Sequence, residues 1–92
     1  DRMALGILVV DARHKPTADD CMMAQVFLSS GKPFLVAANK LDKLKKSEIN
    51  GNQQLIRETL ALSDSIPIIL FSAERGEGKE ELLGKIKHYL EV

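Results

Sequence analysis

Three short apolar runs divide the chain, and a segment with helical periodicity follows each of them. The runs are LGILVV at 5–10, PFLVAA at 33–38 and PIILF at 67–71. None of them alternates apolar with polar residues, which is typical of strands that are buried on both faces of a sheet. The pattern therefore predicts three interior strands, each followed by a helix.

The first helical segment, 16–31, has clear ends in the sequence. Thr17 followed by Asp20 three residues later is a capping box, and Gly31 is a typical helix terminator. Met22 and Met23 each have an apolar residue one helical turn later, and we expect both methionines to pack in the core. The segment therefore predicts a helix that begins after Thr17 and ends at Gly31.

The other two helical segments each carry one apolar stripe. We expect Ser47 to cap the second helix. The stripe of the second helix consists of Ile49, Ile56 and Leu60. The stripe of the third helix consists of Leu82, Leu83, Ile86, Tyr89 and Leu90. Both helices should bury these stripes against the sheet.

The resulting β-α-β-α-β-α order predicts an α/β fold with parallel strands and right-handed crossovers. A length of 92 residues allows one domain, 1–92. We expect a three-layer α/β sandwich whose three strands lie in sequential order. Ligands of such sheets bind beyond the carboxyl ends of the strands, so the polar clusters VDARH, ANKLD and FSAER should share one rim.

The cluster at the end of the second strand, Asn39-Lys40-Leu41-Asp42, is suited to reading a base. The Asp42 carboxylate can only accept hydrogen bonds, and guanine offers it two donors, N1–H and the N2 amine. Adenine has a lone pair at N1 and no amine at C2, so it is rejected. Asn39 can bond its own loop and the base's Hoogsteen edge, and the stem of Lys40 can lie along one face of the base. A polar strand end with no ligand is the alternative interpretation.

The cluster at the end of the third strand, Phe71-Ser72-Ala73-Glu74, complements the first. Backbone amides at this turn are expected to be free to point at a ligand, and the Ala73 N–H would donate to guanine O6. Ser72 could orient Asp42 without itself contacting the base. Alone the SAE sequence is only a strand-to-helix turn. Its position about thirty residues after NKLD makes it informative.

Composition excludes several other classes of protein. Thirteen acidic and thirteen basic residues balance, and there is no Trp, one Tyr and three Phe, so neither net charge nor aromatic stacking argues for nucleic-acid binding. A single cysteine, Cys21, allows no intrachain disulfide and fits a cytoplasmic protein. The longest apolar run is too short to span a bilayer, so no membrane partner is expected.

The pairing of NKLD with a later SAE, together with VVDARHKPTADD at 9–20, carries a family resemblance. The chain resembles the C-terminal half of a translation-factor-class GTPase domain, and more narrowly the ribosome-assembly GTPases called EngB, YsxC or YihA. The matching positions of the second motif are Asp11, Arg13, His14, Pro16, Asp19 and Asp20. The segments NKLDK, LIRETL and ILFSAERGEGKEEL match the base-recognition loop, the next helix, and the last strand and helix. Family members often have Thr where Asn39 stands.

The resemblance implies GTP or GDP as ligand, GTP hydrolysis with Mg²⁺, a role in large-subunit assembly and septation, and a ribosomal particle as partner. The base-binding residues carried over are Asn39, Lys40, Asp42, Ser72 and Ala73, with weaker roles for Leu41, Phe71 and Glu74. No catalytic residue and no metal ligand is expected in these 92 residues.

The phosphate-binding half of such a domain is not in the sequence. No GxxxxGK[ST] loop is present, because GKPF at 31–34 lacks the upstream glycine and GEGKEE at 76–81 lacks the spacing. Because the sequence starts on Asp1 and not on Met, we expect it to begin inside a longer gene product.

Two expectations follow for the chain on its own. We expect it to be inactive as an enzyme, and either to self-associate through the exposed edge of its first strand or to be only marginally stable. The alternative function is a non-catalytic α/β interaction module with no useful nucleotide binding.

Overall fold

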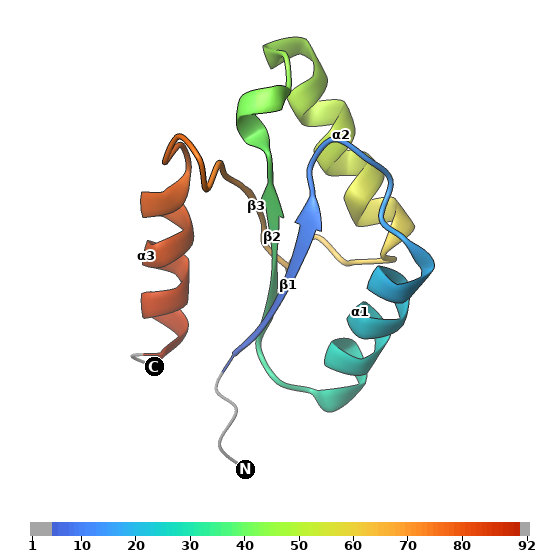
Figure 1. Cartoon of the computed structure of the whole chain (residues 1–92). Helices are drawn as coiled ribbons and strands as arrows, with labels where there is room; N and C mark the ends of the chain where they lie inside the picture. The colour runs from blue at the N-terminus through green and yellow to red at the C-terminus, as the bar shows by residue number, and fades with distance from the viewer. Residues whose placement is uncertain (1–4, 91–92) are drawn as a thin grey trace.

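One parallel sheet of three strands, in the order β1-β2-β3, organises the chain (Figure 1). The computed structural model describes residues 5–90. The elements are β1 (Gly6–Asp11), α1 (Ala18–Ser30), β2 (Phe34–Asn39), the 3₁₀ turn η1 (Leu41–Lys43), α2 (Lys46–Thr59), β3 (Ile68–Leu70) and α3 (Lys79–Leu90). The predicted α/β fold with sequential parallel strands is therefore confirmed.

Helices lie on both faces of the sheet, which gives the three layers that the sequence predicts. Helices α1 and α2 lie on one side of the sheet and α3 lies on the other (Figure 1). The central strand β2 pairs along its length with β1, where Leu8 is opposite Val36, and with β3, where Val36 is opposite Ile68. All three carboxyl ends therefore meet at one rim. Within residues 5–90, no helix is both long and apolar enough to cross a membrane.

The core is centred on β2, whose five residues from Phe34 to Ala38 are all buried. The face toward α1 and α2 forms one cluster with Ile56 and Leu60, which are 0% and 1% exposed. The predicted stripe of α2 is thus confirmed, since Ile49 packs against the same cluster. Continuous apolar sequence in β2 reflects a strand that contacts helices on both sides.

The prediction of burial on both faces is wrong for β1. Ile7 is 38% exposed and Val9 is 58% exposed. On the same face of the sheet, their β2 neighbours Leu35 and Ala37 are 0% and 1% exposed. The layer that contains α3 therefore covers β2 but not β1, which is an edge strand of the described sheet.

The ends of α1 follow the sequence, but two of its predicted core residues do not. Thr17 Oγ1 accepts from the Asp20 amide at 3.1 Å, and the Asp20 carboxylate accepts from the Thr17 amide at 3.0 Å. Gly31 ends the helix with a φ of 72°. Met22 and Met23, however, are 67% and 45% exposed, so their assignment to the core is wrong.

The reason is that apolar side chains occur around much of α1. The side that packs on the sheet is centred on Ala24, which is fully buried, with Phe27 and Cys21 beside it. Met22 lies almost opposite Ala24 on the helix, at 100° per residue. Helical spacing alone could not decide which side faces inward.

Two smaller corrections concern α2 and α3. Helix α2 begins at Lys46, with Lys45 as its N-cap residue, so Ser47 does not cap it. Glu48 instead accepts from the Lys45 amide through its carboxylate at 2.8 Å. In α3, Leu83 is 59% exposed and stands apart from the predicted stripe. The half-buried members of the stripe are Leu82, Ile86 and Tyr89, and the side chain of Leu90 lies outside the described residues.

The rim at the end of β1 is closed by a forked ion pair. The Asp11 carboxylate accepts from the Arg13 amide at 2.8 Å, from Nε at 3.1 Å and from Nη2 at 2.8 Å. These hydrogen bonds from Arg13 lower the pKa of Asp11 from 3.8 to about 2. Both side chains are more than a third exposed, so the pair fixes the turn more than it stabilises the fold.

The connection from β3 to α3 depends on two glycines with positive φ, Gly76 at 85° and Gly78 at 74°. A Cβ atom on Gly78 would overlap the carbonyl oxygen of Leu70 and lie 3.0 Å from Phe71 Cα. Nothing lies within 4 Å of the same atom on Gly76. The GEG sequence is therefore required by a tight turn, and its third residue by close backbone packing.

We predict that Gly78→Ala destabilises the fold by roughly 2 kcal/mol or more, because it combines a left-handed backbone with a clash against β3. Gly76→Ala is the matched control. It has the same backbone conformation in open space and should cost only about 1 kcal/mol. Urea denaturation of both variants measures the difference, and equal midpoints would contradict the close approach of Gly78 to β3.

Candidate functional site

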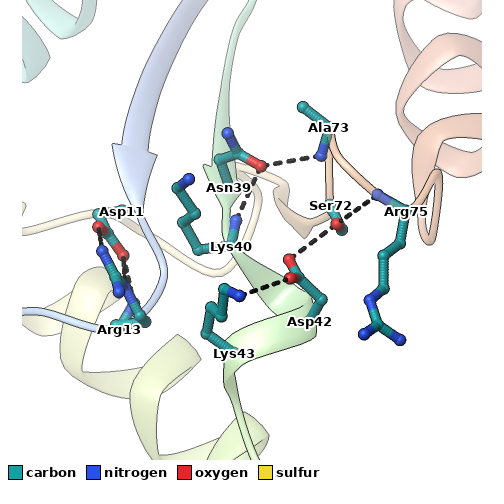
Figure 2. Close-up of polar contacts among 9 residues, drawn as sticks. All are labelled: Asp11, Arg13, Asn39, Lys40, Asp42, Lys43, Ser72, Ala73 and Arg75. Carbon is teal, nitrogen blue, oxygen red and sulfur yellow. Dashed lines mark hydrogen bonds and ion pairs between the residues drawn. The ribbon is translucent and has the colours of Figure 1, made fainter.

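The end of β2 turns sharply, and this turn presents Asp42 to the neighbouring loop (Figure 2). Lys40 has a φ of 79°, the left-handed conformation that lets η1 begin directly after the strand. Leu41 and Leu44 then pack against the core. The turn is closed by backbone hydrogen bonds from Lys43 to Lys40 and from Leu44 to Leu41, at 2.9 and 3.0 Å. Asp42 is therefore held on a rigid turn.

The carboxylate of Asp42 is almost enclosed, since its side chain is 3% exposed. The Ser72 hydroxyl donates to Oδ1 at 2.8 Å, and Lys43 Nζ lies 3.6 Å from Oδ2. The hydrogen bond from Ser72 is the main reason that the pKa of Asp42 is lowered, against the opposing effect of burial. Asp42 is thus an ionised acceptor with part of its capacity unused.

Ser72 is itself fixed by hydrogen bonds to the turn that follows it. It is fully buried, and its amide donates to the Glu77 carbonyl at 2.8 Å. Its Oγ accepts from the Arg75 amide at 2.9 Å, so the hydroxyl hydrogen is directed at Asp42. The structure therefore brings Ser72 and Asp42 together in the arrangement that the sequence predicts.

Ala73 differs from the expectation of a free amide. Its N–H donates to Asn39 Oδ1 at 3.0 Å, and the same oxygen accepts from the Lys40 amide at 2.8 Å. Because β2 and β3 are neighbours, the side chain that ends β2 reaches the first turn after β3. Asn39 bonds its own loop as predicted, and it also occupies the donor that was expected to be free.

The remaining predicted residues surround this centre. The Leu41 amide donates to the Phe71 carbonyl at 3.0 Å, which ties the two loops through their backbones. Lys40 and Phe71 are half-buried, and Glu74 is exposed. The described residues enclose no cavity at these groups. Three hydrogen bonds thus hold the two loops against each other.

Sequence reasoning missed two neighbours of Asp42. Lys43 forms an ion pair with Asp42, although its sequence context is that of a solvated loop. Arg75 acts on the site through its backbone amide, which donates to Ser72 Oγ. Any residue except proline could supply this backbone amide, so the sequence gives no sign of it. Only the fold identifies it.

Magnesium, which the resemblance implies, finds no cluster of ligands in this part of the protein. Among residues 5–90, no three His, Cys, Asp or Glu side chains lie together as a metal site requires. The donor set of these residues does not fit a bound cation. The site holds an ionised acceptor, Asp42, close to the Ala73 amide, which donates to Asn39.

Comparison with known proteins gives a consistent family. The profile of the family described as "Elongation factor Tu GTP binding domain" matches residues 2–92. A probable GTP-binding protein EngB from Geobacillus kaustophilus is 41% identical over 81 residues, which cover 88% of this chain and 42% of that protein. The EngB protein of a second Geobacillus species is 39% identical over 98% of this chain and 47% of its own length.

The fold has a solved counterpart. The crystal structure of a probable GTP-binding protein EngB superposes with a TM-score of 0.86 at 24% sequence identity, covering 98% of this chain and 57% of that one. This chain thus spans about half the length of the relatives that it matches. The profile match over nearly all of its residues shows that the chain belongs to the family of the elongation factor Tu GTP binding domain, and the resemblance to EngB GTPases is confirmed.

Proposed function

We propose that this chain is the guanine-reading part of a GTPase that takes part in ribosome assembly. One observation carries the guanine assignment. The Ser72–Asp42 hydrogen bond of 2.8 Å holds an ionised carboxylate next to the turn that contains the Ala73 amide. An acceptor group and a donor group, contributed by adjacent strands, thereby face the same rim.

This pair matches guanine and mismatches adenine. In the proposed complex Asp42 accepts from N1–H and from the N2 amine, and the Ala73 N–H donates to O6. The O6 atom replaces Asn39 Oδ1 as the acceptor for Ala73, which is a one-for-one exchange of hydrogen bonds. With adenine, the Asp42 acceptor would face another acceptor, and the Ala73 donor would face another donor.

The phosphates of GTP or GDP and the Mg²⁺ ion are proposed to bind outside these 92 residues. The sequence contains no GxxxxGK[ST] loop, and the described residues contain no cluster of metal ligands. The site described above supplies recognition, and hydrolysis is assigned to the whole protein. The ribosomal partner is supported by the resemblance of residues 9–20 to the EngB family, and a cytoplasmic location follows from that role.

A second candidate is a folded interaction module that does not use nucleotide. It is favoured by one observation, that both the Ala73 amide and the Asp42 carboxylate already have partners within the chain. The response of these two groups to guanine nucleotide is a direct measurement that distinguishes the two functions.

We predict that the 92-residue chain binds GDP and GTP with a dissociation constant near the millimolar range, about −4 kcal/mol, because base contacts act without a phosphate loop. It should release no phosphate from GTP above a protein-free control. Isothermal titration and a phosphate assay test this. Micromolar affinity would contradict the assignment of phosphate binding to other residues.

We predict that Asp42→Asn reverses the choice between GMP and XMP. The new amide donor would face the guanine N2 amine, so GMP binding should weaken about tenfold or more. Xanthine has a carbonyl oxygen at C2 and should suit the asparagine. In NMR titrations of ¹⁵N-labelled chain, the Ala73 amide should shift with GMP in wild type and with XMP in the variant.

Asp64→Asn is the matched control for this experiment, because it removes an exposed carboxylate from the loop that precedes β3. The control should keep the GMP response. AMP should shift Ala73 in none of the three proteins. If Asp42→Asn kept the wild-type response to GMP, the carboxylate would not read the base, and the interaction module would be the better account.

We further propose that the isolated chain self-associates through β1. This strand has a free edge in the described sheet, and Val9 on its uncovered face is 58% exposed. Val9→Lys should shift the chain toward monomer, whereas Leu55→Lys, on the 40% exposed position of α2, should not. Light scattering across a concentration series measures both, and a wild-type monomer at every concentration would refute the proposal.

A further inference from the structure

The connection between β2 and α2 separates its side chains by chemistry. Leu41 and Leu44 turn inward and pack against the core. Four lysines lie between or beside them, and three of the four are exposed. These residues, here called the lysine ridge, are Lys40, Lys43, Lys45 and Lys46. The ridge is anchored by two half-buried leucines that pack against the core, and is therefore a fixed surface.

The two acids near the ridge are each held by a hydrogen bond within the chain. Asp42 is the single acid in 39–47, and its side chain is 3% exposed and bonded to Ser72. Glu48 follows, with its carboxylate on the Lys45 amide. The whole chain has no net charge, so this concentration of cations is local. Lys43, Lys45 and Lys46 are exposed, so the ridge offers positive charge to solvent.

Fold stability does not account for these lysines. Lys45 and Lys46 stand at the start of α2, where a positive side chain is unfavourable because the helix dipole is positive there. In the described residues, Lys43 is the ridge member with an ion pair, to Asp42. Four cations held close together repel one another, and an anionic partner would relieve that repulsion.

We propose that the lysine ridge binds the phosphate backbone of structured RNA. Ammonium groups on a fixed surface suit phosphate oxygens, and backbone contacts of this kind carry no sequence information. Residues 39–50 contain no aromatic side chain, so there is no platform on which unpaired bases could stack. A duplex backbone is therefore the form of nucleic acid that fits. The choice of RNA over DNA rests on the proposed ribosomal function.

The ridge begins within the proposed guanine site but extends past it. Lys40 and Lys43 flank Asp42, whereas Lys45 and Lys46 lie beyond η1 at the start of α2 (Figure 2 shows the first two). The last two lysines make no contact with the predicted base-reading groups in the described structure. They can therefore be changed without touching Asp42 or Ala73, which makes the ridge testable on its own.

The test is binding of a short labelled RNA duplex to the full chain, measured by fluorescence anisotropy over a range of salt. K45Q/K46Q is compared with K85Q/K87Q, which removes the same charge from exposed positions of α3. Wild type should bind with an affinity that falls steeply with salt. In K45Q/K46Q affinity should drop about tenfold at low salt, and the slope of log K against log salt should shrink by roughly 2. The control pair should stay within about twofold of wild type.

Folding and the guanine site are monitored in the same variants. K45Q/K46Q removes two unfavourable charges from the start of α2, so its urea midpoint should not fall. Its Ala73 amide should still respond to GMP, which separates loss of RNA binding from loss of the guanine site. If the Asp42→Asn prediction failed while RNA binding stayed intact, the guanine assignment would be wrong. The proposal for the lysine ridge would be unaffected.

Several outcomes would overturn the proposal. If K45Q/K46Q and K85Q/K87Q lost equal affinity for RNA, the loss would be a general effect of charge. A DNA duplex of the same length bound as tightly as RNA would remove the assignment to RNA. Inorganic triphosphate that displaced the duplex at matched phosphate concentration would make the ridge a nucleotide-phosphate site. Anionic vesicles bound in preference to RNA would make it a membrane contact.

Discussion

A nearly enclosed carboxylate, that of Asp42, sets the requirements for both loops of the site. A buried charge is tolerated only where donors satisfy it, and Ser72 supplies the donor here at 2.8 Å. That contact requires β2 and β3 to be parallel neighbours, so that their carboxyl ends meet. It also requires a left-handed Lys40 to turn the chain after β2, and a glycine at 78 to let the following turn pass close to β3.

Much of this architecture could be predicted from the sequence because its signals are local. Unbroken apolar runs indicate interior strands, and the Thr17–Asp20 capping box is a contact between near neighbours. The errors concern features that depend on distant parts of the chain. Whether Val9 is covered depends on where α3 ends up relative to β1, and which side of α1 faces inward depends on the sheet. Neither is encoded in the spacing of apolar residues.

The same distinction applies to the site. Ligand-binding residues gather at the carboxyl ends of parallel strands. This rule predicts from the sequence that Asn39, Asp42 and Ser72 lie close together. The rule says nothing about which donors are already used. The Ala73 amide bonds Asn39, and the Arg75 amide bonds Ser72, because of how two loops pack. Backbone amides are common to all residues except proline, so their partners cannot be inferred from composition.

The β2–α2 connection has to satisfy two opposed electrostatic demands. In its proposed role Asp42 must stay ionised to accept from the donors of a base. Nearby cations favour that state, but a cation bonded directly to the carboxylate would compete with the base. The structure resolves this by distance. The neutral Ser72 hydroxyl makes the short contact and contributes most to the lowered pKa of Asp42, while Lys43 stays at 3.6 Å and contributes less. Lys43 is half exposed, and Lys45 and Lys46, which follow it in the chain, are exposed as well. In the two proposed roles, one rigid turn therefore presents an acceptor, Asp42, to a base and exposed lysines to phosphates.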